Sequence, residues 1–266
     1  MTPEEHAEAA RRLDEAEQTR RQIRMLTITD PRMTMADANA VQNAWRTLKM
    51  ARGERVVGHK IGLTSKAMQA AVGINQPDSG FLTERMVFGD GGVVPVDRFI
   101  GLRIEAELAF VLKSPLAGRG LTVADVIGAT EYVTPALEIL DTRIFRVDPE
   151  TKQTRTVFDT IADNAANAGV VLGGRRFNPS GVDLPRIGAI VAKNGEIEET
   201  GLAAGVLGHP ARGIVWLAAR LAEYGEALKA GEILLAGSFI RPIEVGKGDA
   251  IVADYGEYGE VSVRFG

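Results

Sequence analysis

The sequence predicts an α+β fold, in which a smaller N-terminal helical region (residues 1–54) precedes a β-rich domain (residues 55–266). Two observations lead to this prediction. Helical patterns dominate the first fifty residues, and short β-prone runs separated by Gly, Pro and Asp dominate the rest. Such runs favour a mixed or antiparallel β body over regular βαβ alternation.

The N-terminal region predicts two helices. Residues 4–24 are rich in Ala, Glu and Arg with few large apolar side chains, which is typical of an exposed helix. The second helix starts near Thr34, because Thr34 and Asp37 have the spacing of a capping box. It ends at Gly53, and its apolar positions keep helical intervals at Ala38, Val41, Trp45 and Leu48.

The β-prone runs begin at residue 55. One further helix is expected over residues 209–231, with Pro210 near its start and Gly231 as its stop. Residues 233–266 return to strands with Gly-rich turns. The other expected strands lie in "RVVGHKIGLT", "RMVFGDGGVVPV", "RIEAELAFVL", "YVTPALEIL", "AGVVLGG" and "IGAIVAKNG".

Composition excludes several classes of protein. The net charge of -4 leaves no basic field for a phosphate backbone, so we expect no nucleic-acid partner. No apolar run approaches the roughly 20 residues that span a bilayer, and the charged N-terminus differs from a secretory signal. We therefore expect a cytoplasmic protein with no membrane partner. The absence of cysteine excludes disulfides, thiolate nucleophiles and Cys-ligated metals.

The run "RIEAELAFVL" carries two carboxylates in a strand that is otherwise mostly apolar. Glu105 and Glu107 share one face, because side chains alternate along a strand, and Glu138 lies in a second apolar run, "TPALEIL". Buried like charges repel unless a cation lies between them. Three carboxylates without Cys or His suit Mg²⁺ or Mn²⁺ better than zinc. The alternative is that all three simply face water, with Glu105 and Glu107 on an edge strand.

Several stretches together resemble the fumarylacetoacetate hydrolase superfamily, in its branch of hydratases and decarboxylases of meta-cleavage pathways. The resemblance covers nearly the whole chain. It implies a β-roll or barrel-like body and a catalytic domain in residues 55–266. It also implies a metal site at Glu105, Glu107 and Glu138, and a homo-oligomer built from dimers. The stretches are "GHKIGLTSKAMQ", "PDSGFL", "RIEAELAFVL", "PALEILDTR", "DNAANAGVVLGG" and "AGSFIRPIEVGKGDAIVADYG".

The family's substrates are short 2-oxo or 2-hydroxy-dienoate acids, and its cofactor is Mg²⁺, for which Mn²⁺ is a possible substitute. The segment at residues 148–169 is similar to hydratases that act on a seven-carbon dioate in homoprotocatechuate breakdown. The resemblance therefore implies a dioate hydratase. A 4-oxalocrotonate-type decarboxylase, a 2-oxopent-4-enoate hydratase and a C–C hydrolase stay open as alternatives, as does a non-catalytic binding protein.

Two residues match the family's catalytic positions. Lys60, in "GHKIG", is expected to transfer a proton or stabilise an enolate, with a pKa lowered beside the bound cation. A surface lysine is the alternative. Asp78, in "QPDSG", is expected to orient or deprotonate water, although Pro-Asp-Ser-Gly is also an ordinary turn sequence. His59 alternates to the face opposite Lys60, where packing is expected.

Other polar residues are expected around the substrate. Thr160, Asn164 and Ser238 match positions near the pocket, with simple loop or turn hydrogen bonding as the alternative for each. The distal carboxylate of a dioate requires a basic partner. The nearest candidates in sequence are Arg143, Arg146 and Arg155, each of which could equally be a surface residue.

Overall fold

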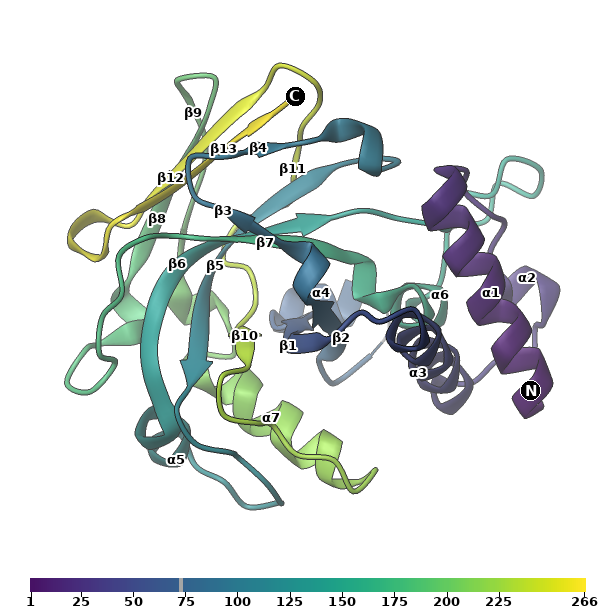
Figure 1. Cartoon of the computed structure of the whole chain (residues 1–266), viewed down its shortest axis with the longest axis horizontal. Helices are drawn as coiled ribbons and strands as arrows, with labels where there is room; N and C mark the ends of the chain where they lie inside the picture. Colours follow the sequence, from purple (N-terminus) through teal and green to yellow (C-terminus); the bar gives the residue numbers. More distant parts are fainter. Residues whose placement is uncertain (72–73) are drawn as a thin grey trace.

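The computed structural model describes residues 1–71 and 74–266, and it has two β-sheets with a group of helices beside the larger one (Figure 1). The larger sheet runs in the order β2-β1-β10-β5-β6-β7-β3, with β11 also paired to β5. Its strands are β1 (Val56–Gly62), β2 (Asp78–Thr83), β3 (Val87–Gly89), β5 (Arg103–Leu112), β6 (Thr130–Leu140), β7 (Asn167–Leu172), β10 (Ile233–Leu235) and β11 (Ile243–Glu244).

The smaller sheet has the order β4-β13-β12-β8-β9 and lies next to the C-terminus (Figure 1). Most neighbours in the two sheets are antiparallel, whereas β1–β10, β3–β7 and β13–β4 are parallel. The prediction of a mixed β body is therefore confirmed. The strands are β4 (Val93–Val94), β8 (Gly188–Lys193), β9 (Glu196–Leu202), β12 (Ala250–Asp254) and β13 (Glu260–Phe265).

Alternation along β5 separates the core from a polar face. The even-numbered side chains from Ile104 to Leu112 are buried in the main hydrophobic cluster, together with residues of the smaller sheet and of helix α7 (Ala211–Ala222). The odd-numbered Glu105 and Glu107 therefore point to the opposite side. This face is where the candidate site lies.

The N-terminal helices are α1 (Pro3–Thr19), α2 (Leu26–Thr29) and α3 (Met35–Ala51). The capping box of Thr34 and Asp37 is present at the start of α3. The prediction of an exposed helix over residues 4–24 is wrong in two respects. Helix α1 ends at Thr19, because Arg20 takes a left-handed φ of 56°, and α1 buries Leu13.

The boundary at residues 54 and 55 stays a prediction. The N-terminal helices share their hydrophobic cluster with three buried residues from the later part of the chain, Ile144, Ile161 and Ala162. Ile161 and Ala162 belong to helix α6 (Val157–Ala162), which packs against α3. The helical region is thus in direct contact with the segment that borders the candidate site.

The helix predicted over residues 209–231 is shorter, since α7 ends at Ala222. Gly225 lies three residues beyond this end with a φ of 71°, a conformation that glycine adopts without strain and that stops a helix. Leu228 is nevertheless buried, through an antiparallel bridge to Leu116. The sequence pattern therefore identified a core residue but assigned it to the wrong element. The remaining helices are α4 (Lys66–Ala71) and α5 (Val123–Ala129).

Strand β10 is only three residues long, so its pairing with β5 ends before it reaches Glu107. Its last residue, Leu235, pairs with Lys60 on one side and with Ala109 on the other. Beyond Leu235 the chain follows β5 irregularly, until β11 pairs with Ile104 and Arg103. Regular pairing on this edge of β5 is thus interrupted beside Glu105 and Glu107.

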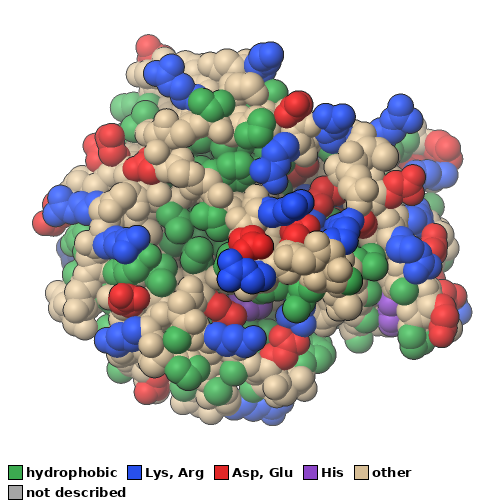
Figure 2. All heavy atoms as spheres, viewed as in Figure 1, with side chains coloured by type: hydrophobic (Ala, Val, Ile, Leu, Met, Phe, Trp, Pro, Cys, Tyr) green, Lys and Arg blue, Asp and Glu red, His purple; other side chains and the backbone are tan. Residues whose placement is uncertain are grey.

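Within the described residues, no helix is both long and apolar enough to cross a membrane. Figure 2 shows Lys and Arg side chains interspersed with Asp and Glu over the visible face. This face therefore carries no extended field of one sign, consistent with the small net charge.

Candidate active site

Three glutamates meet on the polar face of the larger sheet. Strands β5 and β6 are antiparallel neighbours, and their register places Glu105 directly opposite Glu138, with Glu107 two residues further along β5. One carboxylate oxygen from each lies within 4.8 Å of the others. Glu107 and Glu138 are buried and Glu105 is half-buried, and β5 lies inside the sheet, between β6 on one side and β10 and β11 on the other. The interpretation of these residues as a solvated edge is therefore wrong.

The acidic cluster lacks sufficient protein donors. Glu107 Oε2 accepts a hydrogen bond of 2.7 Å from the Gly237 N–H, but Glu107 Oε1 and both oxygens of Glu138 are buried without a hydrogen-bond partner. Burial, followed by the charge of Glu138, raises the pKa of Glu105 to about 8. Burial also raises the pKa of Glu107 and of Glu138. Orphaned carboxylate oxygens in this number fit a hard divalent cation.

Lys60 is the cation that the chain itself places beside the cluster. It lies on β1, its side chain is buried, and its Nζ is 3.5 Å from Glu138 Oε1. The surface alternative is therefore wrong. Burial alone would lower the pKa of Lys60, but Glu138 and the neighbouring carboxylates outweigh it and raise this pKa. A lowered pKa thus requires the added positive charge of a bound cation, and stays a prediction.

The side chains of Asp78 and Lys60 both fit beside residue 62 because that residue is glycine. Asp78 is the first residue of β2 and pairs with Gly62 on β1. A Cβ built at Gly62 would lie 2.2 Å from Asp78 Oδ1 and 2.8 Å from Lys60 Nζ. The missing side chain thus leaves room for both groups. Asp78 Oδ1 is buried without a partner, and burial raises the pKa of this carboxyl.

A cavity of about 350 Å³ adjoins these residues. Its size suits a small organic acid, since ligand sites generally begin at about 300 Å³. It combines the catalytic candidates with basic and apolar side chains. The lining includes Lys60, Gly62, Asp78, Arg103, Glu105, Leu140, Arg146, Arg155, Val157, Thr160 and Pro242.

The three predicted substrate contacts lie in different surroundings. Thr160 lines the cavity. Asn164 is fully buried, and its side-chain amide bonds both backbone groups of Phe81 at 2.8 and 3.0 Å. The Ser238 hydroxyl donates to the Ile240 carbonyl at 2.9 Å, which closes a turn. Asn164 and Ser238 are outside the residues that line the cavity, so for them a substrate contact stays a prediction.

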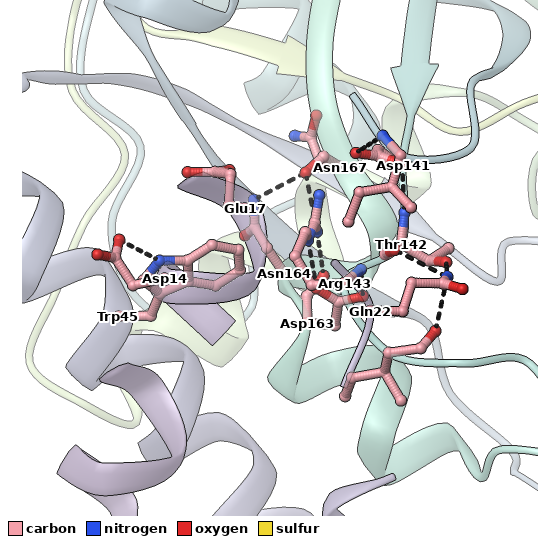
Figure 3. Close-up of polar contacts among 12 residues, drawn as sticks. Asp14, Glu17, Gln22, Trp45, Asp141, Thr142, Arg143, Asp163, Asn164 and Asn167 are labelled. Carbon is pink, nitrogen blue, oxygen red and sulfur yellow. Dashed lines mark hydrogen bonds and ion pairs between the residues drawn. The ribbon is translucent and has the colours of Figure 1, made fainter. Parts of the chain in front are cut away.

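The three arginines predicted as partners of a distal carboxylate also differ in position. Arg143 is fully buried and donates from Nε to Asp163 Oδ1 and from Nη2 to the Asp163 carbonyl (Figure 3). It is absent from the cavity lining, whereas Arg146 and Arg155 line the cavity. His59 faces Glu232 at 3.9 Å, and burial lowers its pKa to about 4. His59 is therefore packed, in agreement with the alternation along β1.

Two residues of the site were missed in the sequence, although both carry a signal. Arg103 is two residues before Glu105 and lines the same cavity. Gly62 is two residues after Lys60 and provides the space described above. Extending the strand alternation by one step in each direction would have found both.

Comparison with known proteins agrees with this geometry. No family model matches the sequence. The chain is 55% identical over 260 residues to 2-oxo-hept-4-ene-1,7-dioate hydratase of Escherichia coli, covering 98% of this chain and 97% of that protein. The structure of 4-oxalocrotonate decarboxylase from Pseudomonas putida G7 with magnesium and adipate superposes with a TM-score of 0.94, at 39% identity over 100% of this chain and 98% of that one.

A more distant structure shares the fold. Fumarylpyruvate hydrolase from Pseudomonas aeruginosa, solved with Mn²⁺ and pyruvate, gives a TM-score of 0.57 at 16% identity, covering 78% of this chain and 88% of that chain. The fold is thus shared with a decarboxylase and with a hydrolase. The chain belongs to the fumarylacetoacetate hydrolase superfamily, in its branch of dienoate hydratases and decarboxylases.

Proposed function

We propose that the chain is a divalent-metal-dependent hydratase, a hydro-lyase that adds water to 2-oxo-hept-4-ene-1,7-dioate and forms 4-hydroxy-2-oxo-heptane-1,7-dioate. The pathway would be the meta-cleavage breakdown of homoprotocatechuate. The observation that carries the proposal is the buried three-carboxylate cluster in a chain 55% identical to a hydratase of this substrate. Mg²⁺ is the proposed ion, with Mn²⁺ as a substitute, since a 39% identical relative was solved with magnesium.

Glu105, Glu107 and Glu138 would hold the ion. Its positive charge would stabilise negative charge on the C2 oxygen of the substrate. The reaction then needs a proton moved from C3 to C5, water added at C4 and a proton returned to C3. Lys60 and Asp78 are the chain's groups beside the cavity that can exchange protons with substrate or water.

Decarboxylation is the second candidate, because a 39% identical relative is a 4-oxalocrotonate decarboxylase. The same carboxylates and lysine could serve either reaction. A 2-oxopent-4-enoate hydratase is a third possibility, since a protein of that activity is 38% identical. A C–C hydrolase is disfavoured, because His59, the only nearby candidate for its histidine base, is packed against Glu232 outside the cavity lining.

Incubation of the protein and Mg²⁺ with each dienoate tests the reaction. Hydration predicts the 4-hydroxy product without CO₂, while CO₂ release without that product would overturn the proposal. Lys60→Met is expected to lower kcat about 10²- to 10⁴-fold, the usual effect of losing a general acid or base. Lys113→Met is the matched control, since Lys113 is exposed and is absent from the cavity lining.

Two coarser properties complete the proposal. A cytoplasmic location is part of the proposal, because the proposed substrate is a small metabolic acid. A homo-oligomer built from dimers is supported by large apolar side chains that remain exposed in the smaller sheet, among them Ile190, Ile197 and Leu202. Light scattering coupled to size-exclusion chromatography would test this, and a monomer across micromolar concentrations would contradict it.

A further inference from the structure

Arg155 carries an unmatched charge beside the active site. Its Nη1 atom is buried without a hydrogen-bond partner. No ion pair of its guanidinium is found among residues 1–71 and 74–266. Burial lowers the pKa of Arg155, and the charge of Asp163 only partly offsets this effect. Asp163 is itself paired with Arg143, so Arg155 lacks a carboxylate of its own.

Arg155 is half-buried, and Arg143 Nη1 also lacks a hydrogen-bond partner, but basic residues that are more deeply buried each have a carboxylate partner within the chain. Arg143 pairs with Asp163, Lys60 with Glu138, and Lys49 with Glu17. A buried charge without a partner costs several kcal/mol, so folded chains rarely retain one that has no ligand. Arg155 therefore differs from these residues in a way that points to an anion from outside the chain.

The position of Arg155 identifies where that anion would be bound. Arg155 lines the same cavity as Lys60, Asp78 and Glu105, and a second arginine, Arg146, lines it too. The two belong to one hairpin, because the Arg155 N–H donates to the Arg146 carbonyl at 2.9 Å and Val147 bridges to Thr154. The cavity lining thus contains the carboxylates of Asp78 and Glu105 and three arginines, of which Arg103 is paired with Glu244.

The hairpin is fixed in place by buried contacts at its tip and base. Asp148, which is fully buried, accepts two hydrogen bonds from Arg24, at 2.8 and 3.0 Å, and another from the Thr151 N–H. At the base, Gln22 donates to the Thr142 hydroxyl at 2.8 Å (Figure 3). The N-terminal region therefore holds the hairpin that carries both arginines, which reduces the entropic cost of binding.

We propose that Arg155, assisted by Arg146, binds the second carboxylate of the substrate and makes the enzyme selective for dioates over monocarboxylic dienoates. This inference rests on the proposed function. A planar guanidinium can donate two parallel hydrogen bonds to a carboxylate, which fits this role better than a lysine would. The substrate would then be held at both ends, with its 2-oxo acid end at the glutamates and its distal end at the hairpin.

Two unreactive ligands isolate the distal carboxylate. In the presence of Mg²⁺, 2-oxoheptanedioate and 2-oxoheptanoate differ only in that group and lack the double bond that is hydrated. Calorimetry should give the wild-type chain about 10- to 100-fold tighter binding of the dioate, as expected for one charge-assisted contact. Arg155→Gln should reduce that ratio to about 1- to 3-fold, and Arg155→Lys should restore part of it.

Lys152→Gln is the matched control. Lys152 is on the same hairpin, is exposed, and is absent from the cavity lining, so its variant should keep the wild-type ratio. The ratio of kcat/KM for the dienedioate over 2-hydroxypenta-2,4-dienoate should change in parallel.

Equal affinity of the wild-type chain for the two ligands would overturn the inference without any variant, as would an unchanged ratio in Arg155→Gln. An equal loss for both ligands would assign Arg155 a structural role and overturn it too. These outcomes leave the proposed function intact if the wild-type chain still hydrates the dienedioate. Absence of hydration by the wild-type chain with Mg²⁺ would overturn both proposals.

Discussion

Two charge clusters include residues on or just after strand β6, and they differ in how their charges are balanced. In one, Arg143 donates from its side chain to the carboxylate and the carbonyl of Asp163, and its backbone N–H reaches the second carboxylate oxygen at 2.9 Å (Figure 3). In the other, Glu105, Glu107 and Glu138 face a single lysine, and several of their oxygens have no partner.

The difference shows that burial of charge does not by itself identify a functional site. Arg143, Asp163, Glu107 and Glu138 are all buried, but the Arg143–Asp163 pair satisfies most of its own donors and acceptors. The glutamate cluster has an excess of acceptors, which the protein cannot neutralise alone. An imbalance between buried donors and acceptors is therefore the informative feature, because it requires a ligand from outside the chain.

Breaking the Arg143–Asp163 pair should have the largest effect on stability. Asp163→Ala would leave Arg143 buried without its counter-charge, and we expect the free energy of unfolding to fall by about 3–5 kcal/mol. Urea denaturation followed by circular dichroism would measure this. A loss below about 1 kcal/mol would mean that the pair contributes little and that the contrast with the glutamate cluster is overstated.

Removing a charge from the glutamate cluster should change the stability gained from Mg²⁺ more than the stability without it. Glu138→Gln takes away one of the mutually repelling carboxylates but also the partner of Lys60, which Asp78, Glu105 and Glu107 still face. The stability measured with a chelator should therefore fall less than in Asp163→Ala. Mg²⁺ at 100 times its Kd should stabilise the wild-type chain by about 2.7 kcal/mol, and this increment should be lost in the variant. Glu131→Gln, at an exposed position of the same strand β6, is the control. A full Mg²⁺ response in Glu138→Gln would exclude Glu138 as a ligand.

His59 provides a test of how burial alone affects a titratable side chain. Its pKa is lowered to about 4, chiefly by burial, against a usual value near 6.5. Between these values the unfolded chain binds more protons than the folded chain, so this residue makes stability decline as pH falls from about 6.5 to 4. The expected loss between pH 7 and pH 5 is about 2 kcal/mol. The difference between the wild-type chain and His59→Gln isolates this contribution. Parallel pH profiles would contradict it.

An exposed ion pair should have the smallest effect. Arg186 and Asp183 lie 3.1 Å apart, with side chains 87% and 64% exposed. Water screens both charges, so Asp183→Ala should change the free energy of unfolding by less than about 0.5 kcal/mol. This variant is also the control for Asp163→Ala, because the same substitution is made at an exposed and at a buried aspartate.

Part of the site could be predicted because it follows strand geometry. The spacing of Glu105 and Glu107 placed them on one face of a strand, and the alternation at His59 and Lys60 separated a packed residue from one beside the glutamates. The end of the last predicted helix was wrong, because Gly225 interrupts an apolar pattern that continues to Leu228. Local patterns identified what is buried better than they identified where an element ends.

The sequence by itself determined the chemistry available, namely carboxylates without cysteine and a lysine on an alternating strand. Only the tertiary structure decided which of these groups meet. The register of β5 and β6 places Glu105 opposite Glu138, and Gly62 leaves the space that Lys60 and Asp78 share. The sequence could not distinguish Arg143, Arg146 and Arg155 as partners of a distal carboxylate. In the structure Arg143 is paired in the core, whereas Arg146 and Arg155 line the cavity. The physical reason is that side-chain alternation is local, whereas strand pairing and burial depend on contacts between distant segments.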